Sequence, residues 1–456
     1  MAIYERKDAG EQPYWKLGPF KLRLPLIHYR IELPEVLQGF IIFAVGMGVI
    51  PLLQTHVGMS YEAALAVFII YSFTMILPSL LGEPFVPGWI TPAVPLVILY
   101  LGDFELGPEA VQALVALQLL VAVIFLILGV TKLGSKLVEW LPKSLKGGIL
   151  IGAGLAAITG EIQSGSRLIE TPITLIIGSI ICFYLMFSVS FQALYKRNKW
   201  AKLIANYGIM PAIILAIIIG WVTKEYPLPN IQWGFTVPAF AEMWSYTPFV
   251  VGFPSLDVFL IAIPTAIIAY IIAYGDIIVG TTLMKRADEV RKDEKVDFNV
   301  DRLHFITFIR NIIHAFIAPH PGMSGPVFTA GLATIIERYR FGRKAMDSIF
   351  SGSGTFVIAM AVAVFLLPLV TLFQPVLPVA LSLTLILTGY ICITVGVEQI
   401  KTPAERGVAG IMAIVLSIYG ATYGLLVGVV LYFIIERSSK LKKEKDVFDK
   451  NTKHTA

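Results

Sequence analysis

Long apolar runs alternate with short polar segments along almost the whole chain. A helix that crosses a bilayer needs roughly 20 apolar residues. The longest runs are Leu33–Leu53, Tyr61–Leu81, Ala110–Val130, Thr171–Leu194, Ile204–Val222, Phe259–Met284, Phe350–Phe373 and Leu377–Val397. Shorter runs are Gly147–Gly160, His304–Ala318, Gly407–Tyr419 and Ala421–Glu436. Two others, Ile90–Leu101 and Met323–Ile336, are too short to cross alone. Together the runs predict about fourteen transmembrane segments.

Composition supports this interpretation. The 456 residues are 56% hydrophobic and 15% charged, with a mean hydropathy of +0.77, whereas a soluble domain is usually about 25% charged. The sequence therefore predicts an all-α, polytopic membrane protein with the lipid bilayer as a second solvent. Cys182 and Cys392 lie inside apolar runs, which indicates buried thiols rather than a disulfide or a metal site. Residues 1–32 are polar and charged and do not resemble a cleavable signal peptide.

The distribution of Lys and Arg predicts the topology. With fourteen spans, nearly all basic connections fall on the side of the two termini, and that side is the cytoplasm by the positive-inside rule. The residues concerned are Lys132, Lys136, Lys143, Lys146, Lys196, Arg197, Lys199, Lys202, Lys285, Arg286, Arg291, Lys292, Lys295, Arg302, Arg338, Arg340, Arg343, Lys344, Lys401 and Arg406. The opposite side holds Arg167 and Lys224. We expect a protein of the cell (inner) membrane with both termini cytoplasmic and the loop Thr223–Asp257 external.

A repeated motif divides the chain into two halves. Pro87-Gly88-Trp89-Ile90-Thr91-Pro92 and Pro321-Gly322-Met323-Ser324-Gly325-Pro326 both read Pro-Gly-x-x-x-Pro, and each opens the third segment of a group of seven. Proline extends the residue before it and suits the first turn of a helix. Each motif therefore predicts a short extended stretch that leads into a half-helix. Because seven is odd, the second group is inverted, and the two half-helices meet near the midplane, as in secondary transporters.

Two spans resemble a known family. The first span, from Leu37-Gln38-Gly39 to Val49-Ile50-Pro51-Leu52-Leu53, and the eighth, Tyr274-Gly275-Asp276-Ile277-Ile278-Val279-Gly280-Thr281, are similar to segments of the nucleobase–ascorbate (uracil/xanthine) permeases. The resemblance implies a seven-plus-seven inverted-repeat fold, alternating access, and a homodimer formed through a gate. Its core would comprise residues 33–130 and 258–373, and its gate residues 131–222 and 374–436. A segment 1–32, an external loop 223–257 and a tail 437–456 complete the chain.

Some residues differ from that family's pattern. Gly39 stands where the family has histidine, its acidic residue in span 8 falls on Ile272, and its Glu-Asn pair falls near Val327-Phe328. Those family residues would hydrogen-bond nucleobase edges. The related sulfate permeases share the architecture and bind anions, so a small-anion transporter for sulfate, bicarbonate or a carboxylate stays an alternative to nucleobase symport.

The candidate site lies at the two breaks. A carboxylate in mid-span is expensive and marks a functional candidate, so Asp276 is expected to bind substrate or couple H⁺ or Na⁺ transport. Arg310, also in mid-span, is expected to neutralise Asp276, with an anionic substrate as the alternative. The helix starts, with their free N–H groups, predict substrate contacts at Gly46, Ile90, Thr91, Ala93, Met323, Ser324, Gly325 and Val327. Gln38 is expected to form a hydrogen bond across the core.

Other functions fit less well. A channel of the same fold would use similar half-helices and stays open as an alternative. An intramembrane enzyme would need a nucleophile with a base, or paired carboxylates, and no such set is present. The sequence holds no phosphate-binding glycine loop for ATP, no metal motif and no charge pattern for nucleic acid. We therefore expect a transporter with no cofactor.

Overall fold

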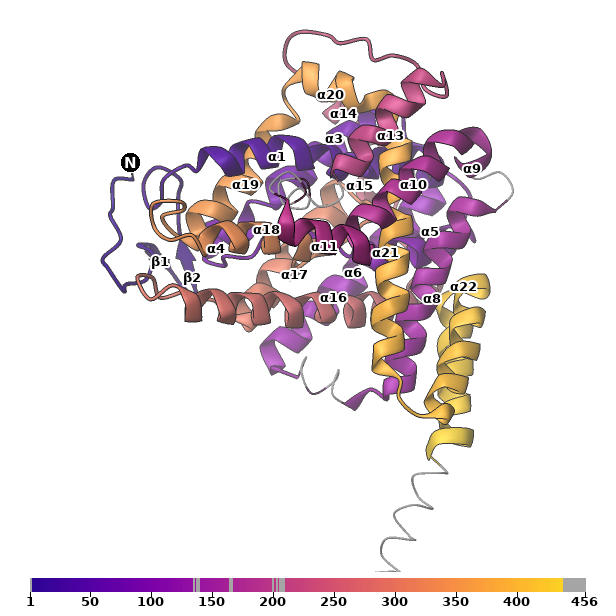
Figure 1. The fold of residues 1–456 in the computed structure, drawn as a ribbon. Coiled ribbons are helices and arrows are strands. Elements are labelled where there is room, and N and C mark those ends of the chain that lie inside the picture. Colours follow the sequence, from indigo (N-terminus) through magenta and orange to yellow (C-terminus); the bar gives the residue numbers. More distant parts are fainter. Residues whose placement is uncertain are drawn as a thin grey trace, which may run out of the picture.

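The computed structural model describes residues 2–437 except 134–135, 137–139, 164–166, 199–200, 202–203 and 205–209 (Figure 1). The fold is almost entirely helical. Of the predicted tail 437–456 only Arg437 is described, and Lys199 and Lys202 also lie outside the described residues.

A short hairpin, β1 (Trp15–Leu17) and β2 (Phe20–Leu22), precedes the first helix. The N-terminal segment packs on the protein: Lys21 pairs with Glu11 and Asp297, and the buried Arg23 pairs with Glu11 and lies over the Phe350 ring. These basic side chains therefore meet carboxylates of the protein itself.

The first half of the chain is broken into helices at Gly and Pro residues. Its elements are α1 (Leu33–Gly46), α2 (Val49–Val57), α3 (Tyr61–Thr74), α4 (Leu77–Leu81), β3 (Gly88–Trp89), η1 (Thr91–Ala93), α5 (Val94–Leu101), α6 (Pro108–Thr131), α8 (Lys143–Ile162), α9 (Arg167–Glu170), α10 (Pro172–Phe187), α11 (Val189–Arg197) and α13 (Met210–Val222). The loop that follows carries α14 (Phe240–Trp244) and α15 (Pro248–Val251).

The second half repeats the order of elements. It comprises α16 (Leu256–Val290), α17 (Val300–Ile317), β4 (Ser324–Gly325), α18 (Thr329–Tyr339), α19 (Ile349–Ala363), α20 (Leu367–Phe373), η2 (Gln374–Val376), α21 (Leu377–Gln399), α22 (Pro403–Leu431) and the π-helical turn η3 (Tyr432–Arg437). Capping boxes at Ser348 and Thr402 start α19 and α22, as expected where a side chain satisfies the free N–H groups of the first turn.

The helix α22 is a hairpin of two arms that turns at Gly420. This residue has φ +83° and ψ −175°, outside helical geometry. A Cβ on Gly424 would lie 2.4 Å from Cβ of Leu416, and one on Gly428 would lie 2.4 Å from the Met412 sulfur. In a straight helix, residues 8 and 16 positions apart would be roughly 12 and 24 Å apart. The two arms are therefore antiparallel and correspond to the predicted runs Gly407–Tyr419 and Ala421–Glu436.

Corresponding helices of the two halves pack against each other in antiparallel register. A Cβ on Gly154 of α8 would lie 2.5 Å from the Gly389 carbonyl oxygen of α21, and one on Gly389 would lie 2.8 Å from that of Gly154. Gly147 and Gly396 show the same reciprocal contact, at 2.9 and 3.0 Å. Small residues let membrane helices approach this closely. Since α8 and α21 contain the predicted fifth spans of the two groups, the contact fits an inverted repeat.

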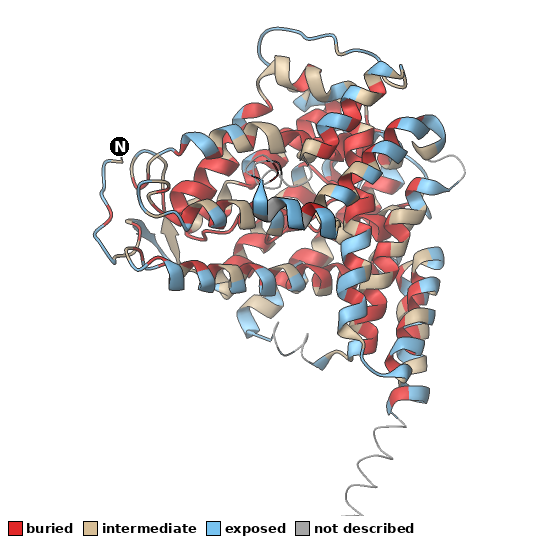
Figure 2. Cartoon of the chain, in the orientation of Figure 1, coloured by how far each residue is buried: buried red, intermediate tan, exposed pale blue. Residues whose placement is uncertain are grey.

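The helices form two packed groups. In one, α16 and α17 pack on α6, and α1 packs on α19; in the other, α8 packs on α21 and α22, and α10 packs on α13 and α21. In Figure 1, α8 and α21 stand upright, whereas α1 and α16 run across the view. The sides that the helices turn toward one another are buried (Figure 2).

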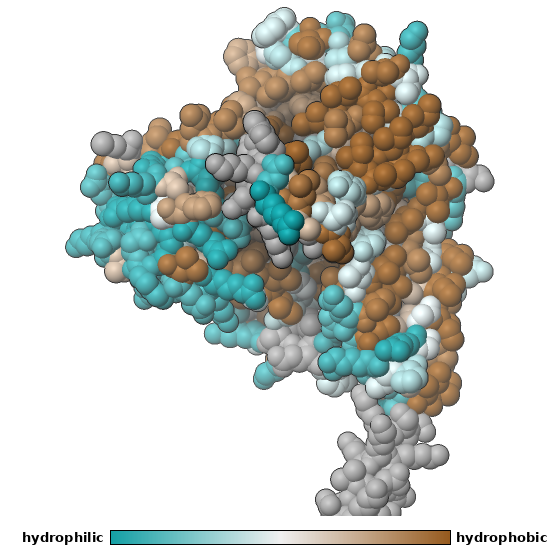
Figure 3. Space-filling model, viewed as in Figure 1, coloured by the Kyte–Doolittle hydropathy of each residue, from teal (hydrophilic) through white to brown (hydrophobic). Residues whose placement is uncertain are grey.

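Several helices are suited to a membrane. Within the described residues, seven helical segments are long and apolar enough to cross: Leu33–Val57, Tyr61–Leu81, Pro108–Thr131, Lys143–Glu170, Leu256–Val290, Leu367–Gln399 and Pro403–Arg437. Four shorter apolar helices accompany them, namely Thr91–Leu101, Pro172–Phe187, Pro211–Val222 and Ile349–Ala363. Apolar side chains cover the surface near α10 and α13, whereas the surface around the N-terminal hairpin is polar (Figure 3). The count of fourteen spans stays a prediction.

The connection Lys285–Arg302 is partly buried despite its many charges. The helix α16 continues to Val290, and Arg291 and Glu294 are buried. The N-terminal segment binds here: Arg6 pairs with Asp293 at 3.0 Å, and Lys295 N donates to the Gly10 carbonyl at 3.1 Å. Pairing of opposite charges thus accompanies the burial of Arg291 and Glu294, while Lys292 and Lys295 between and beside them stay exposed.

Candidate functional site

The two Pro-Gly breaks lie against each other, as the sequence predicts. β3 and β4 pair antiparallel, with Gly88 opposite Gly325 and Trp89 opposite Ser324. Two further backbone hydrogen bonds extend the pair: Ile90 N donates to the Gly322 carbonyl at 3.0 Å, and Phe328 N to the Val86 carbonyl at 2.7 Å. Residues that lie 235 and 237 positions apart in the chain thus pair in one small sheet between the half-helices α5 and α18.

Close backbone contact explains why position 325 in the second break is a glycine. A Cβ on Gly325 would lie 2.6 Å from the Trp89 carbonyl oxygen and 3.0 Å from Ile90 N, so a side chain at this position would separate the strands. Met323, two residues earlier, has φ +48°, an uncommon conformation for a residue other than glycine.

Two neighbouring side chains of α17 hold the second break from behind. Asn311 donates to the Ser324 carbonyl at 2.9 Å and accepts from Ser324 N at 3.0 Å. Arg310 Nη1 donates to the Gly325 carbonyl at 2.7 Å. These contacts satisfy buried backbone groups that the short sheet leaves free. Asn311 was not among the residues predicted from sequence, because a mid-helix Asn carries no local sign of its partner.

The predicted contact residues border the sheet. Ile90, Ala93, Met323, Ser324 and Val327 are buried, and Thr91 is half-buried. Neither α5 nor α18 has a side-chain cap at its start. η1, which precedes α5, packs against α8 and α21, so this site adjoins both groups of helices.

Asp276 lies at the start of the second half-helix. It is half-buried on α16, and Thr329, the first residue of α18, donates its hydroxyl to Asp276 Oδ1 at 3.1 Å. Cys392 of α21 lies close enough to interact electrostatically with this carboxylate. The carboxylate therefore stands beside the break and near the second group of helices, and Thr329 joins the site as a residue that sequence reasoning missed.

The expected pairing of Arg310 with Asp276 is wrong in this structure. Asp276 bonds to Thr329, and Arg310 bonds to the Gly325 carbonyl and lies beside Tyr71. Arg310 of α17 is directed to β4, whereas Asp276 of α16 is directed to the first residue of α18. Sequence spacing placed both residues in mid-span but could not show that they meet different partners.

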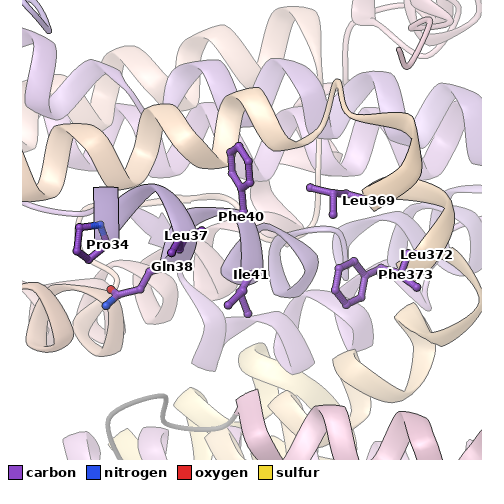
Figure 4. A pocket seen from close by; sticks show the side chains of 8 residues that line it. All are labelled: Pro34, Leu37, Gln38, Phe40, Ile41, Leu369, Leu372 and Phe373. Atoms are coloured by element: carbon purple, nitrogen blue, oxygen red, sulfur yellow. The ribbon is translucent and has the colours of Figure 1, made fainter. Parts of the chain in front are cut away.

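Gln38 also differs from expectation. The predicted hydrogen bond across the core is not formed, since the buried Gln38 Oε1 has no partner within the described residues. The side chain instead lines a cavity of about 380 Å³ with Leu37, Phe40, Leu369 and Phe373 (Figure 4). Leu37 is 58% exposed, so this cavity opens on an apolar outer surface, away from the two breaks.

The neighbouring positions Gly39 and Gly46 serve close packing. A Cβ on Gly39 would lie 2.6 Å from Ala359 Cβ and from the Phe356 carbonyl oxygen on α19, which leaves no room for a histidine in this arrangement. A Cβ on Gly46 would lie 2.9 Å from the Phe68 ring. Phe68 stacks on Tyr71, whose ring meets Trp89 edge to face. Gly46 is therefore connected to the first break through packed rings rather than directly.

The residues present offer no metal centre. Within the part of the chain that the structure describes, no three His, Cys, Asp or Glu side chains gather in a way that could hold a metal ion. His314 contacts the Thr74 hydroxyl at 2.8 Å and the Ala318 carbonyl at 3.2 Å.

Solved structures show the same overall fold. The chain matches "The overall structure of SLC26A9" with a TM-score of 0.55 and 17% identity, over 88% of this chain and 65% of that one. The transmembrane domain of a cyanobacterium bicarbonate transporter, BicA, matches with a TM-score of 0.51 and 16% identity, over 87% of this chain and 97% of that one. The murine Slc26a9 anion transporter in its inward-facing state gives 0.52 and 15%, over 88% and 67%. The chain thus spans about two thirds of the SLC26A9 chains.

Sequence comparison gives the family. No curated protein matches. The family model described as "Permease family" (Xan_ur_permease) matches residues 32–296, more than half of the chain and including both β3 and Asp276. The chain therefore belongs to the xanthine/uracil permease family and is a membrane transporter.

Proposed function

We propose that this permease carries a small polar solute of the nucleobase type, by alternating access and in symport with H⁺ or Na⁺. The observation that carries the proposal is the position of Asp276, whose carboxylate accepts the Thr329 hydroxyl at the first turn of α18. Substrate would bind there, between Thr91–Ala93 and Met323–Val327.

The chemistry of a nucleobase suits this position. A uracil or xanthine ring has N–H donors and carbonyl acceptors on one edge and apolar faces. Asp276 Oδ1 accepts from Thr329, and the carboxylate has further acceptor sites for ring N–H groups. Backbone N–H groups at an uncapped helix start suit a polarised carbonyl. The half-buried Trp89 offers an aromatic face for stacking.

Movement would occur between the two groups of helices. We propose that α1–α6 and α16–α20 form a core that carries the substrate, and that α8–α13, α21 and α22 form a gate. Because η1 contacts α8 and α21, a shift of the core against the gate would change access to the site. Fourteen spans, cytoplasmic termini and a homodimer formed through the gate complete this proposal.

A small anion is the second candidate. Two uncapped half-helix starts favour negative charge, and the similar solved proteins include a bicarbonate transporter and an anion transporter. An ionised Asp276 would repel such a substrate, whereas it would attract the N–H edge of a nucleobase. We therefore favour the nucleobase type.

Binding to purified protein distinguishes the two candidates. Radiolabelled uracil and xanthine should bind, and excess unlabelled nucleobase should displace them while sulfate and bicarbonate do not. Thr329→Val, which removes the hydroxyl beside Asp276, should weaken binding roughly tenfold, as expected for a lost hydrogen bond in a charged network. Thr334→Val serves as the control because Thr334 is on the same helix and bonds only to the Ala330 carbonyl. Binding of bicarbonate or sulfate without nucleobase binding would contradict the proposal.

A further inference from the structure

A group of buried polar side chains lies behind β4, on the side of α3 and α17. Tyr71, Arg310, His314, His320 and Ser324 are all at most 2% exposed. The His314 and His320 rings lie 4.6 Å apart, and the Tyr71 ring lies 5.0 Å from His320. Arg310 interacts electrostatically with both histidines. α17 packs against α3, α4, α6 and β4, and Arg310 bonds to the Gly325 carbonyl, whereas Asp276 bonds to Thr329 of α18.

Hydrogen-bond donors exceed acceptors in this group. His314 is satisfied on both ring nitrogens. Within the described residues, however, Arg310 Nε and Nη2, both ring nitrogens of His320 and the Ser324 hydroxyl are buried without a hydrogen-bond partner. Buried polar groups in proteins are normally paired, so these atoms together indicate a missing acceptor.

The positive charge of Arg310 also lacks a counter-charge. No ion pair joins Arg310 to an acidic side chain in the described part of the chain, and Asp276 is directed to Thr329. The Tyr71 hydroxyl interacts with the guanidinium as a hydrogen-bond partner, but it carries no charge and does not neutralise it. A buried, unpaired charge is strongly unfavourable, so an anion satisfies this site better than a neutral acceptor.

We propose that the protein binds one small inorganic anion, of the size of chloride, between Arg310, His320 and Ser324. The guanidinium N–H groups, an imidazole N–H and the Ser324 hydroxyl are its donors. Full burial of the surrounding side chains excludes a bulky organic anion, and the single guanidinium charge matches a monovalent one. Bound there, the anion neutralises the arginine that holds the Gly325 carbonyl and so stabilises the second break. Ser324 also borders the proposed solute site, but the unpartnered donors of Arg310 and His320 are present whichever solute is transported.

Thermal unfolding in matched salts tests the site. Purified wild-type protein is compared in sodium gluconate, chloride and bromide at equal ionic strength. Chloride and bromide should raise the midpoint saturably, by roughly 3 °C or more, as expected for a ligand that binds only the folded state. Arg310→Met should abolish the response. Arg340→Met, which removes an exposed arginine paired only with Glu337, should retain it. Equal midpoints in all three salts, or a response that persists in Arg310→Met, would overturn the proposal.

Two further measurements apply if Arg310→Met does not fold. His320→Ala and Ser324→Ala should each raise the chloride concentration needed for half-maximal stabilisation, by roughly tenfold for one hydrogen bond to an anion. Crystals of wild-type protein grown in bromide should show an anomalous peak within hydrogen-bonding distance of Arg310. Water alone at Arg310 in such crystals, or an unchanged chloride dependence in both variants, would contradict the site.

Discussion

Gly325 lies directly against the backbone of Trp89 where the two halves of the site meet. A Cβ on Gly325 would lie 2.6 Å from the Trp89 carbonyl oxygen and 2.7 Å from its carbonyl carbon. Both obstacles are backbone atoms of the paired strands, so no side-chain movement relieves the contact. The antiparallel pairing of β3 and β4 therefore depends on a glycine at position 325.

Gly325→Ala should open this pairing and abolish solute binding. Even a methyl group must displace β3 or β4, which moves the starts of both half-helices. Binding of labelled nucleobase should fall at least tenfold, while size-exclusion chromatography still shows folded protein. Gly410→Ala is the control, since a Cβ on this helical glycine meets nothing within 4 Å. Unchanged affinity in Gly325→Ala would place the solute elsewhere.

Asp276→Asn should separate coupling from binding. The change removes the titratable group but retains an oxygen that accepts the Thr329 hydroxyl. Exchange of solute across proteoliposomes should continue, whereas accumulation driven by a proton or sodium gradient should be lost. Stability should hardly change, because Arg310 is not the partner of Asp276. A variant that melts early and is rescued by Arg310→Ala would show instead that the two residues form a pair.

Glu294 should make the folded protein less stable as the pH rises toward neutrality. Burial raises the pKa of Glu294 from 4.5 to about 7, against the opposing effect of Arg6 and of the Tyr339 hydroxyl. The folded state thus holds this proton more tightly than the unfolded state. The stabilisation is complete below pH 4.5 and is lost between about pH 4.5 and 7, by roughly 3 kcal/mol.

Glu294→Gln tests this dependence, because the amide keeps an acceptor for Tyr339 and Ile349 N. Thermal midpoints measured from pH 5 to 8 should decline more steeply in the wild type than in the variant. Glu337→Gln, at an exposed position of α18, should follow the wild type. Parallel curves for wild type and Glu294→Gln would refute the role of Glu294.

The topology prediction can be tested with single cysteines. Both positions must be accessible: Gln232 and Lys292 are exposed, whereas Glu294, two residues further on, is buried. In a background without Cys182 and Cys392, a membrane-impermeant maleimide added to intact cells should label Gln232→Cys and spare Lys292→Cys. Labelling of Lys292→Cys should appear only after the cells are opened. The reverse pattern would invert the topology.

The repeated Pro-Gly motif carried most of what the sequence could predict. It placed two half-helices and their extended stretches, and the structure pairs them as β3 and β4. Apolar runs likewise gave the helices, including the hairpin of α22, with Gly420 between its arms.

Side-chain partners were less predictable, because they depend on which face of a helix meets which neighbour. Arg310 and Asp276 lie in mid-span yet bond to Gly325 and Thr329. Asn311, central to the second break, carried no local signal.

Uptake by proteoliposomes measures coupled nucleobase transport itself. Vesicles containing the purified wild-type protein are given an inward proton or sodium gradient and radiolabelled uracil or xanthine. We expect accumulation above the external concentration. It should be lost when the gradient is collapsed, and unlabelled nucleobase should compete with it, whereas sulfate and bicarbonate should not. Vesicles that take up labelled sulfate or bicarbonate and exclude both nucleobases would contradict this expectation.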